Sequence, residues 1–328
     1  MQSRYFFSKA AVTLALVGLG ATGAAYAQNT DFPTKAINIT VTFPPGGGTD
    51  MLARLIGNYF TEELNQSAIV ENRPGASGNV GARMVAERPA DGYSLLMVNS
   101  SYAVNPGVFS KMPFDPKKDF DAIINFAYVP SILVTHPDSP YKTLGDVTKA
   151  GAPTDNQVSY GSCGNGTPQH LAGEMLNISA KTHIQHVPYK GCGPLLTDVL
   201  GQQIAMGYVT ASSAMPHIKA GKLRALGTTA KERSTLLPDV ATIAEQGYPG
   251  YELNQWHGLL TPSGTPDAIK TKLYESVTKI VARPDIQKRL ADLGYSAAND
   301  GPAAFQKIVH DDIDRFAAIS KQIGLKVD

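Results

Sequence analysis

The stretch INITVTFPPGGGTD, residues 37–50, leads from a β-rich run through a glycine turn into a helix. The β-prone residues 37–43 predict a strand, and residues 51–64 predict a helix. Glycines between the two let backbone N–H groups approach a ligand, and the first N–H groups of a helix lack partners within it. The stretch therefore predicts one unit of an α/β fold with an anion-binding turn.

This turn supplies the first candidate binding residues. It lacks the lysine of a nucleotide-binding P-loop and does not fit the pattern G-x-G-x-x-G, so it does not indicate a nucleotide site. An ordinary glycine turn with an N-cap side chain at its end remains the alternative. The candidate ligand-binding residues here are Phe43, Gly47, Gly48, Thr49 and Asp50.

Short β-rich runs alternate with helix-like runs along the rest of the chain, which predicts a parallel sheet covered by helices on both faces. The further strands are expected at residues 68–71, 93–98, 158–160, 183–187, 204–209 and 223–228. The further helices are expected at residues 78–88, 168–176, 194–200, 213–220, 270–283, 284–293 and 303–323.

Two α/β units therefore share the chain, and two segments are predicted to cross between them, residues 120–136 and 251–260. We expect residues 28–130 plus 251–328 to form domain 1, and residues 131–250 to form domain 2. A cleft between two such domains is the default place for a ligand.

The second unit repeats the glycine turn as GSCGNGTP, residues 161–168. Thr167 suits a helix N-cap and Pro168 suits the first helical position. Both turns follow strands at their carboxyl ends, where doubly wound sheets bind ligands. Facing each other, they fit a small carboxylate. The added candidates are Ser162, Gly164, Asn165 and Thr167, with Asn99, Ser100, Ser101, Tyr208 and Thr210 at neighbouring strand ends.

Composition and the first residues narrow the class of protein. A hydrophobic share of 43% excludes disorder, and a formal net charge of +1 gives no bulk attraction to nucleic acid. Arg4 and Lys9, an apolar run over residues 10–23 and the Ala25-Tyr26-Ala27 sequence predict a signal peptide. We expect cleavage after Ala27 and export to the periplasm of a Gram-negative bacterium.

Seven segments carry a resemblance to a known family: FPPGGGTD, ENRPGASGNVGA, ADGYSLL, GNGTPQHLAGE, HVPYKGCGP, PHIKAGKLRALGTT and WHGLLTPSGTP. Together they resemble the Bug-type solute receptors, the periplasmic binding components of tripartite tricarboxylate transporters. The resemblance implies a type II periplasmic-binding-protein fold, two lobes each with a mainly parallel sheet, and no cofactor. It also implies a monomer that passes a small carboxylate to inner-membrane transporter subunits. The turns at residues 43–50 and 161–167 would hold one carboxylate, and residues 99–101 and 208–210 would shape the remainder.

One position departs from the family pattern. Members that bind amino acids usually carry an aspartate where this chain has Val209. An unpaired ligand ammonium in a closed cleft would cost on the order of 1–3 kcal/mol. We therefore expect a ligand without an amine, either a di- or tricarboxylate or an aromatic carboxylate.

The two cysteines leave two interpretations open. Cys163 and Cys192 each follow a predicted strand at the same sheet edge, so an exported chain is expected to join them in a disulfide. If the cysteines were free thiols, Cys163 beside His170 would suggest a secreted α/β hydrolase with Cys163 as its nucleophile. A serine is the other candidate nucleophile, but the sequence contains no G-x-S-x-G elbow. A docking scaffold is a third class. We expect that the protein is not an enzyme. We also expect no metal site, because His183 and His186 point to opposite faces of one strand.

Overall fold

A computed structural model of the chain describes residues 31–152, 158–234 and 237–326. The fold below is that of the described residues from Pro33 onward. The predicted signal peptide and its cleavage site lie outside the described residues.

The described residues contain one sheet of ten strands, in the order β2-β1-β3-β9-β4-β7-β5-β6, with β8 and β10 pairing with β4. Each β–α connection on this sheet returns the chain to a strand of the same sheet, as the alternation in the sequence predicts. The strands are β1 (Ile37–Val41), β2 (Ala68–Asn72), β3 (Ser94–Asn99), β4 (Phe120–Thr135), β5 (Ser159–Ser162), β6 (Gln185–Pro188), β7 (Met206–Thr210), β8 (Arg224–Thr228), β9 (Asn254–Pro262) and β10 (Ser296–Asp300).

Strand β4 divides the sheet into two lobes. Its first part, Phe120–Pro130, pairs with β9, and its last part, Ser131–Thr135, pairs with β7. We call β2-β1-β3-β9-β10 with the first part lobe 1, and β7-β5-β6-β8 with the last part lobe 2. Only the outer three strands of each lobe are parallel, whereas β4 runs antiparallel to all four of its neighbours.

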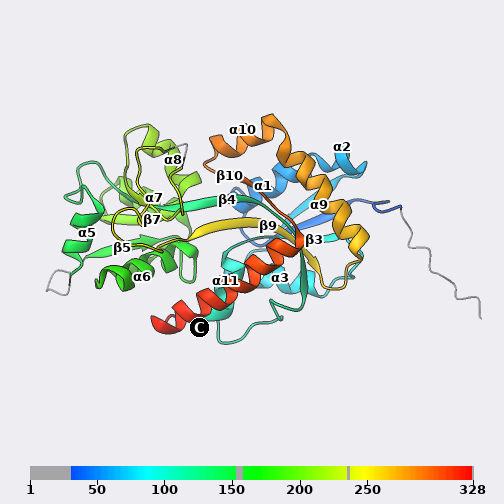
Figure 1. The fold of residues 1–328 in the computed structure, drawn as a ribbon, viewed down its shortest axis with the longest axis horizontal. Coiled ribbons are helices and arrows are strands. Elements are labelled where there is room, and N and C mark those ends of the chain that lie inside the picture. The colour runs from blue at the N-terminus through cyan, green and yellow to red at the C-terminus, as the bar shows by residue number, and fades with distance from the viewer. Residues whose placement is uncertain (1–30, 153–157, 235–236, 327–328) are drawn as a thin grey trace, which may run out of the picture. The chain divides into compact units, whose positions relative to one another are not determined.

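Figure 1 shows β4 and β9 running between two groups of helices. One group holds α5–α8, and the other holds α1, α2, α9 and α10. The two predicted crossing segments thus correspond to β4 and to β9 with the residues before it. The helices are α1 (Gly48–Gly57), α2 (Phe60–Leu64), α3 (Asn79–Ala86), α4 (Ser101–Val108), α5 (Leu144–Ala150), α6 (Pro168–Ala180), α7 (Cys192–Leu200), α8 (Ala211–Lys219), α9 (Asp267–Ala282), α10 (Pro284–Asp292) and α11 (Pro302–Gln322), with a 3₁₀ turn η1 (Ala76–Gly78).

The structure corrects several predicted elements. The helix expected over residues 51–64 is divided into two helices. Helix α1 ends at Gly57, and α2 begins at Phe60. Helices α4 and α5 and strand β10 were not predicted. Helix α4 contains Pro106, which is unfavourable inside a helix, and β10 has a mostly exposed, weakly apolar pattern. Neither segment therefore carries a strong sequence signal.

Trp256 anchors β9 to the core of lobe 1. Its backbone N–H donates to Ser100 Oγ at 2.9 Å, and its indole N–H donates to Asp312 Oδ2 at 2.9 Å. The ring meets Phe305 edge-on, with centroids 5.1 Å apart. Because side chains alternate along a strand, Gln255 and His257 on either side of Trp256 point away from this core, toward the opposite face.

Candidate functional site

The first glycine turn, residues 43–50, joins β1 to α1 and leaves the start of the helix uncapped. Its N-cap residue, Gly47, has extended backbone angles and makes no side-chain cap hydrogen bond. Gly46 has φ of 80°, a conformation that favours glycine. The first N–H groups of α1 are therefore open to an external acceptor, and the positive end of the helix dipole lies beside them.

Asp50 holds this turn in shape from behind. Its carboxylate accepts hydrogen bonds from the Gly46 backbone and from Asn72 Nδ2, each at 2.9 Å, and it pairs with Arg54. Burial alone would raise the pKa of the Asp50 carboxyl, but the hydrogen bonds from Arg54, Gly46 and Asn72 outweigh it and lower that pKa. Asp50 is therefore an ionised brace of the turn.

The second turn, residues 161–167, joins β5 to α6 in the same way. Thr167 is the N-cap, since its Oγ1 accepts a hydrogen bond from the His170 backbone at 3.3 Å, and Pro168 is the first helical residue. Both predictions are confirmed. Ser162 Oγ accepts from the Gly164 backbone at 3.2 Å and lies 2.6 Å from His186 Nε2.

Two stacked histidines support this second turn. The rings of His170 and His186 lie 3.6 Å apart, and His170 Nδ1 accepts a hydrogen bond from the Gly166 backbone at 3.3 Å. Burial lowers the pKa of His170 to about 4. Burial and the neighbouring His170 lower the pKa of His186 to about 3. Both rings are therefore neutral at neutral pH, and they hold the turn without a charge.

A disulfide joins Cys163 in the second turn to Cys192 at the start of α7, which confirms the predicted pairing. These are the two cysteines of the chain. The bond removes the thiol that a Cys163 nucleophile would need, so the hydrolase interpretation loses its nucleophilic cysteine.

The two turns open onto one cavity of about 520 Å³ between the lobes. Lobe 1 contributes residues of the first turn, and lobe 2 contributes Cys163 and Thr167 from the second. Eight of the fourteen predicted binding residues line this cavity: Phe43, Gly47, Gly48, Thr49, Asn99, Ser101, Thr167 and Thr210.

The structure places the other six predicted residues outside the cavity lining. Asp50 and Ser162 lie behind their turns, and Gly164 and Asn165 belong to the second turn without reaching the cavity. Ser100 is fully buried and accepts its bond from Trp256. Tyr208 lies in the core of lobe 2, where it contacts Tyr251.

Sequence reasoning missed several residues of the cavity wall. Gln255 and His257 come from β9, where their alternation around Trp256 was the available signal. Tyr295 follows α10 with no local motif, and its hydroxyl lies against Gly48. Burial raises the pKa of Tyr295 to about 12, opposed by its interaction with Ser212 of lobe 2. The other missed residues include Gln169, Lys190, Ser212 and Ser213.

The cavity wall carries little charge. Among the described residues that line it, Lys190 is the one charged side chain, and none is Asp or Glu. Val209, the position that departs from the family pattern, is fully buried. It pairs with Ile132 in the sheet and does not line the cavity. The described residues of the wall therefore offer no carboxylate as a partner for a ligand ammonium group.

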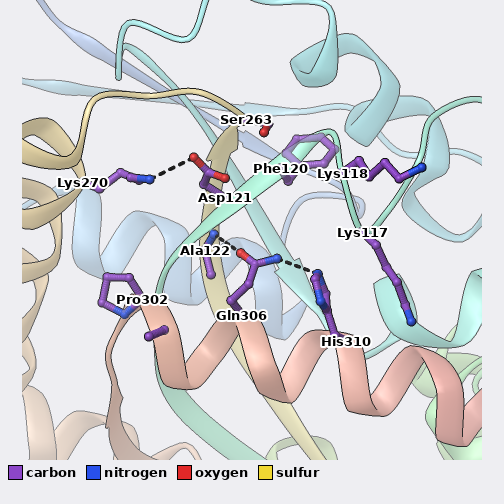
Figure 2. A pocket seen from close by; sticks show the side chains of 11 residues that line it. Lys117, Lys118, Phe120, Asp121, Ala122, Ser263, Lys270, Pro302, Gln306 and His310 are labelled. Carbon is purple, nitrogen blue, oxygen red and sulfur yellow. Dashed lines mark hydrogen bonds and ion pairs between the residues drawn. The ribbon is translucent and has the colours of Figure 1, made fainter.

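A second hollow, on lobe 1, has a different character (Figure 2). It measures about 380 Å³ and lies between β4 and α11. Lys270 pairs with Asp121 at 3.0 Å, while Gln306 accepts from the Ala122 backbone and lies 2.8 Å from His310. These polar groups of the hollow are thus bonded to one another.

Within residues 31–152, 158–234 and 237–326, no cluster of three or more His, Cys, Asp or Glu side chains is placed to hold a metal ion. Over the same residues, no helix has both the length and the apolar character needed to cross a bilayer.

Comparison with known proteins agrees with this geometry. Residues 52–325 match the model of the tripartite tricarboxylate transporter family receptors. Protein BugT of Bordetella pertussis is 30% identical over 298 residues, which cover 90% of this chain and 91% of BugT.

Two solved structures superpose over most of the chain. Rpa4515 of R. palustris with adipate has a TM-score of 0.83 and 32% identity, covering 90% of this chain and all of that one. MatC of Rhodopseudomonas palustris with bound malate has a TM-score of 0.78 and 30% identity, and the match covers 88% of this chain and 99% of MatC. The chain thus belongs to the tripartite tricarboxylate transporter family of receptors, as a Bug-type periplasmic solute-binding protein and not an enzyme.

Proposed function

We propose that this receptor binds a small organic carboxylate without an amino group in the cavity between its lobes. The observation that carries the proposal is the convergence of two glycine turns, one from each lobe, on a single cavity. Each turn precedes a helix, so the uncapped N–H groups of α1 and the positive ends of two helix dipoles lie beside one cavity. A carboxylate accepts several such hydrogen bonds at once, and charge-assisted bonds of this kind are the strong ones.

The absence of an acidic side chain among the described residues of the wall supports a ligand without an amine. A ligand ammonium in the cavity would lose its hydration without gaining a carboxylate partner, because Asp50 already serves Gly46, Asn72 and Arg54. Burying an unpaired charge is costly. Di- and tricarboxylates and aromatic carboxylates therefore remain the proposed ligands, in line with adipate and malate in Rpa4515 and MatC.

The proposed biological role is delivery of this acid to inner-membrane transporter subunits from the periplasm, by a monomer whose residues 1–27 are removed. The proposed domains are residues 28–130 plus 251–328 and residues 131–250. The change of partners along β4 at Pro130 and Ser131 supports this division. Closure of two such domains around a ligand would create the surface that a membrane partner recognises.

A thermal-shift panel of organic acids tests the proposal. A ligand at 100 times its Kd adds about 2.7 kcal/mol to the free energy of unfolding, so one class of acid should raise the melting temperature clearly. Glutamate and its deaminated analogue glutarate form the matched pair for the amine. Equal affinity for the two would remove the claim about the amine, and no response to any carboxylate would overturn the proposed function.

A further inference from the structure

The Cys163–Cys192 disulfide lies in the wall of the cavity between the lobes. Both cysteines line this cavity, and both are half-buried. Cys163 belongs to the second turn, whereas Cys192 is the first residue of α7. The bond therefore joins two separate parts of the cavity wall in lobe 2, which are the second turn and the start of α7.

The start of α7 has few other restraints. Its N-cap residue, Gly191, makes no side-chain cap hydrogen bond, and the Gly191 backbone N–H donates to the Cys163 carbonyl at 3.0 Å. A Cβ placed on Gly191 or Gly193 would meet no atom within 4 Å, so the backbone here is loosely packed. Helix α7 is anchored further along, where Leu195 and Val199 are fully buried. The disulfide is therefore a main restraint on the position of the helix start.

Cleavage of the disulfide would loosen one wall of the cavity and spare the other. The first turn is braced by the carboxylate of Asp50, which does not react under conditions that reduce a disulfide. In lobe 2, strands β5 and β6 are paired from Ser159 to Ser162, and this ladder does not involve the sulfur atoms. We therefore expect the reduced protein to keep its fold while the second turn and the start of α7 gain freedom.

We propose that the Cys163–Cys192 disulfide is a redox switch for ligand affinity, with the oxidised receptor as the high-affinity form. The inference rests on the proposed function, because it takes the ligand to be a carboxylate bound in this cavity. Reduction transfers two electrons and two protons from an external dithiol, which leaves thiols at Cys163 and Cys192 and a disulfide in the dithiol. Binding must then order the loosened wall, and this ordering lowers the affinity.

The coupling between the disulfide and the ligand is reciprocal. If reduction weakens binding by a given factor, bound ligand makes reduction less favourable by the same factor. An acid in the cavity also occupies the space that both cysteines line, so it hinders a reductant that enters there. The receptor then binds its ligand tightly once the disulfide has formed, as it does in an oxidising compartment.

Isothermal titration calorimetry tests the switch with four probes: malate, citrate, adipate and terephthalate. The tightest of the four is titrated into oxidised wild type and into wild type reduced with dithiothreitol, which is uncharged at neutral pH. The reduced protein should bind it about tenfold more weakly. Cys163→Ser with Cys192→Ser should bind as weakly with and without dithiothreitol, which controls for direct effects of the reductant. Circular dichroism checks that each form is folded.

A second measurement does not require the reduced chain to be folded. The initial rate at which dithiothreitol reduces the native protein is followed by thiol labelling. This rate should fall about tenfold in the presence of the same acid at 20 times its Kd, where only about 5% of the sites are free. A probe that does not bind should leave the rate unchanged.

Equal affinity of the oxidised and reduced forms would overturn the switch and leave the proposed function standing. A reduction rate that the bound acid does not change would do the same, including where the reduced chain unfolds and its affinity has no meaning. Binding of none of the four probes to the oxidised protein would overturn the proposed function together with the switch.

Discussion

The two glycine turns face the same cavity, but different chemistry holds each one in place. The first turn is braced by an ionised carboxylate, Asp50, with hydrogen bonds from the Gly46 backbone, Asn72 and Arg54. The second turn is fixed by the Cys163–Cys192 disulfide and supported by the neutral rings of His170 and His186. A glycine turn before a helix is thus stabilised by a charge in one lobe and by a covalent bond in the other.

This difference shows that the sequence of an anion-binding turn does not determine which groups stabilise it. The turn needs glycine at its tight positions and a helix directly after it, and both turns have these features. The supporting groups come from elsewhere in the chain, and each lobe uses what its neighbouring elements provide. The two turns should therefore respond differently to reduction, to loss of charge and to acid.

Removal of the disulfide should have the largest effect. Cys163→Ser with Cys192→Ser opens a loop with a sequence separation of 29 residues. The chain-entropy model predicts a loss of about 3–4 kcal/mol in the free energy of unfolding. Urea denaturation of the variant and of wild type with reductant should give the same loss. A loss confined to the serine variant would show that the serines, and not the missing bond, are responsible.

Loss of the charge on Asp50 should destabilise the first turn. Asp50→Asn keeps the shape but weakens hydrogen bonds to a charged group, each of which contributes about 1.5–3 kcal/mol. The matched variant is Arg54→Gln, whose side chain is 48% exposed, and exposed ion pairs contribute only about 0–1 kcal/mol. Urea denaturation should rank Asp50→Asn as the more harmful change, and the reverse order would contradict the role of Asp50 as the brace.

Acid should act on the second turn through its histidines. The pKa of His170 is about 4 in the folded chain and about 6.5 when unfolded, so the unfolded chain takes up the proton first. Stability from this group is complete above pH 6.5 and is lost as the pH falls toward 4. Between pH 7 and pH 5 the wild type should lose about 2 kcal/mol more than His170→Asn. Equal losses in urea denaturation at the two pH values would contradict this account.

A methyl group at the first turn should have the smallest effect of the four changes. The Cβ of Gly48→Ala would collide with the Tyr295 hydroxyl, and overpacking of this kind costs about 1 kcal/mol or more. Ligand affinity measured by calorimetry should fall about fivefold. Gly193→Ala is the control, because Gly193 also lines the cavity at the start of a helix and its Cβ would meet no atom within 4 Å. A similar loss in both variants would argue against the Tyr295 contact.

The sequence predicted the parts of the fold that rest on local patterns. The strand, glycine turn and helix of each lobe are adjacent in the chain, so both turns were located, with Thr167 and Pro168 in the predicted places. The disulfide followed from two cysteines at one sheet edge. The parallel strands followed from alternation, but the antiparallel pairing of β4 with its four neighbours did not, because strand order depends on contacts between distant segments.

The cavity wall was less predictable for the same reason. His257 and Tyr295 come from segments far from either turn, and they reach the cavity only because β9 lies between β3 and β4 and because α10 ends near α8. Tyr208 was expected in the cleft from its place near a strand end. Thr210, the last residue of β7, lines the cavity, whereas Tyr208, two residues further inside the strand, is covered by the core of lobe 2.

The position of Trp256 gives the protein an intrinsic optical probe. It is the only tryptophan of the chain, and its neighbours Gln255 and His257 both line the cavity. Its indole is hydrogen-bonded to Asp312 and its backbone to Ser100, so a small displacement of β9 changes the surroundings of the fluorophore. Emission from a single residue therefore allows ligand titrations without any label, and each spectral change can be assigned to one strand.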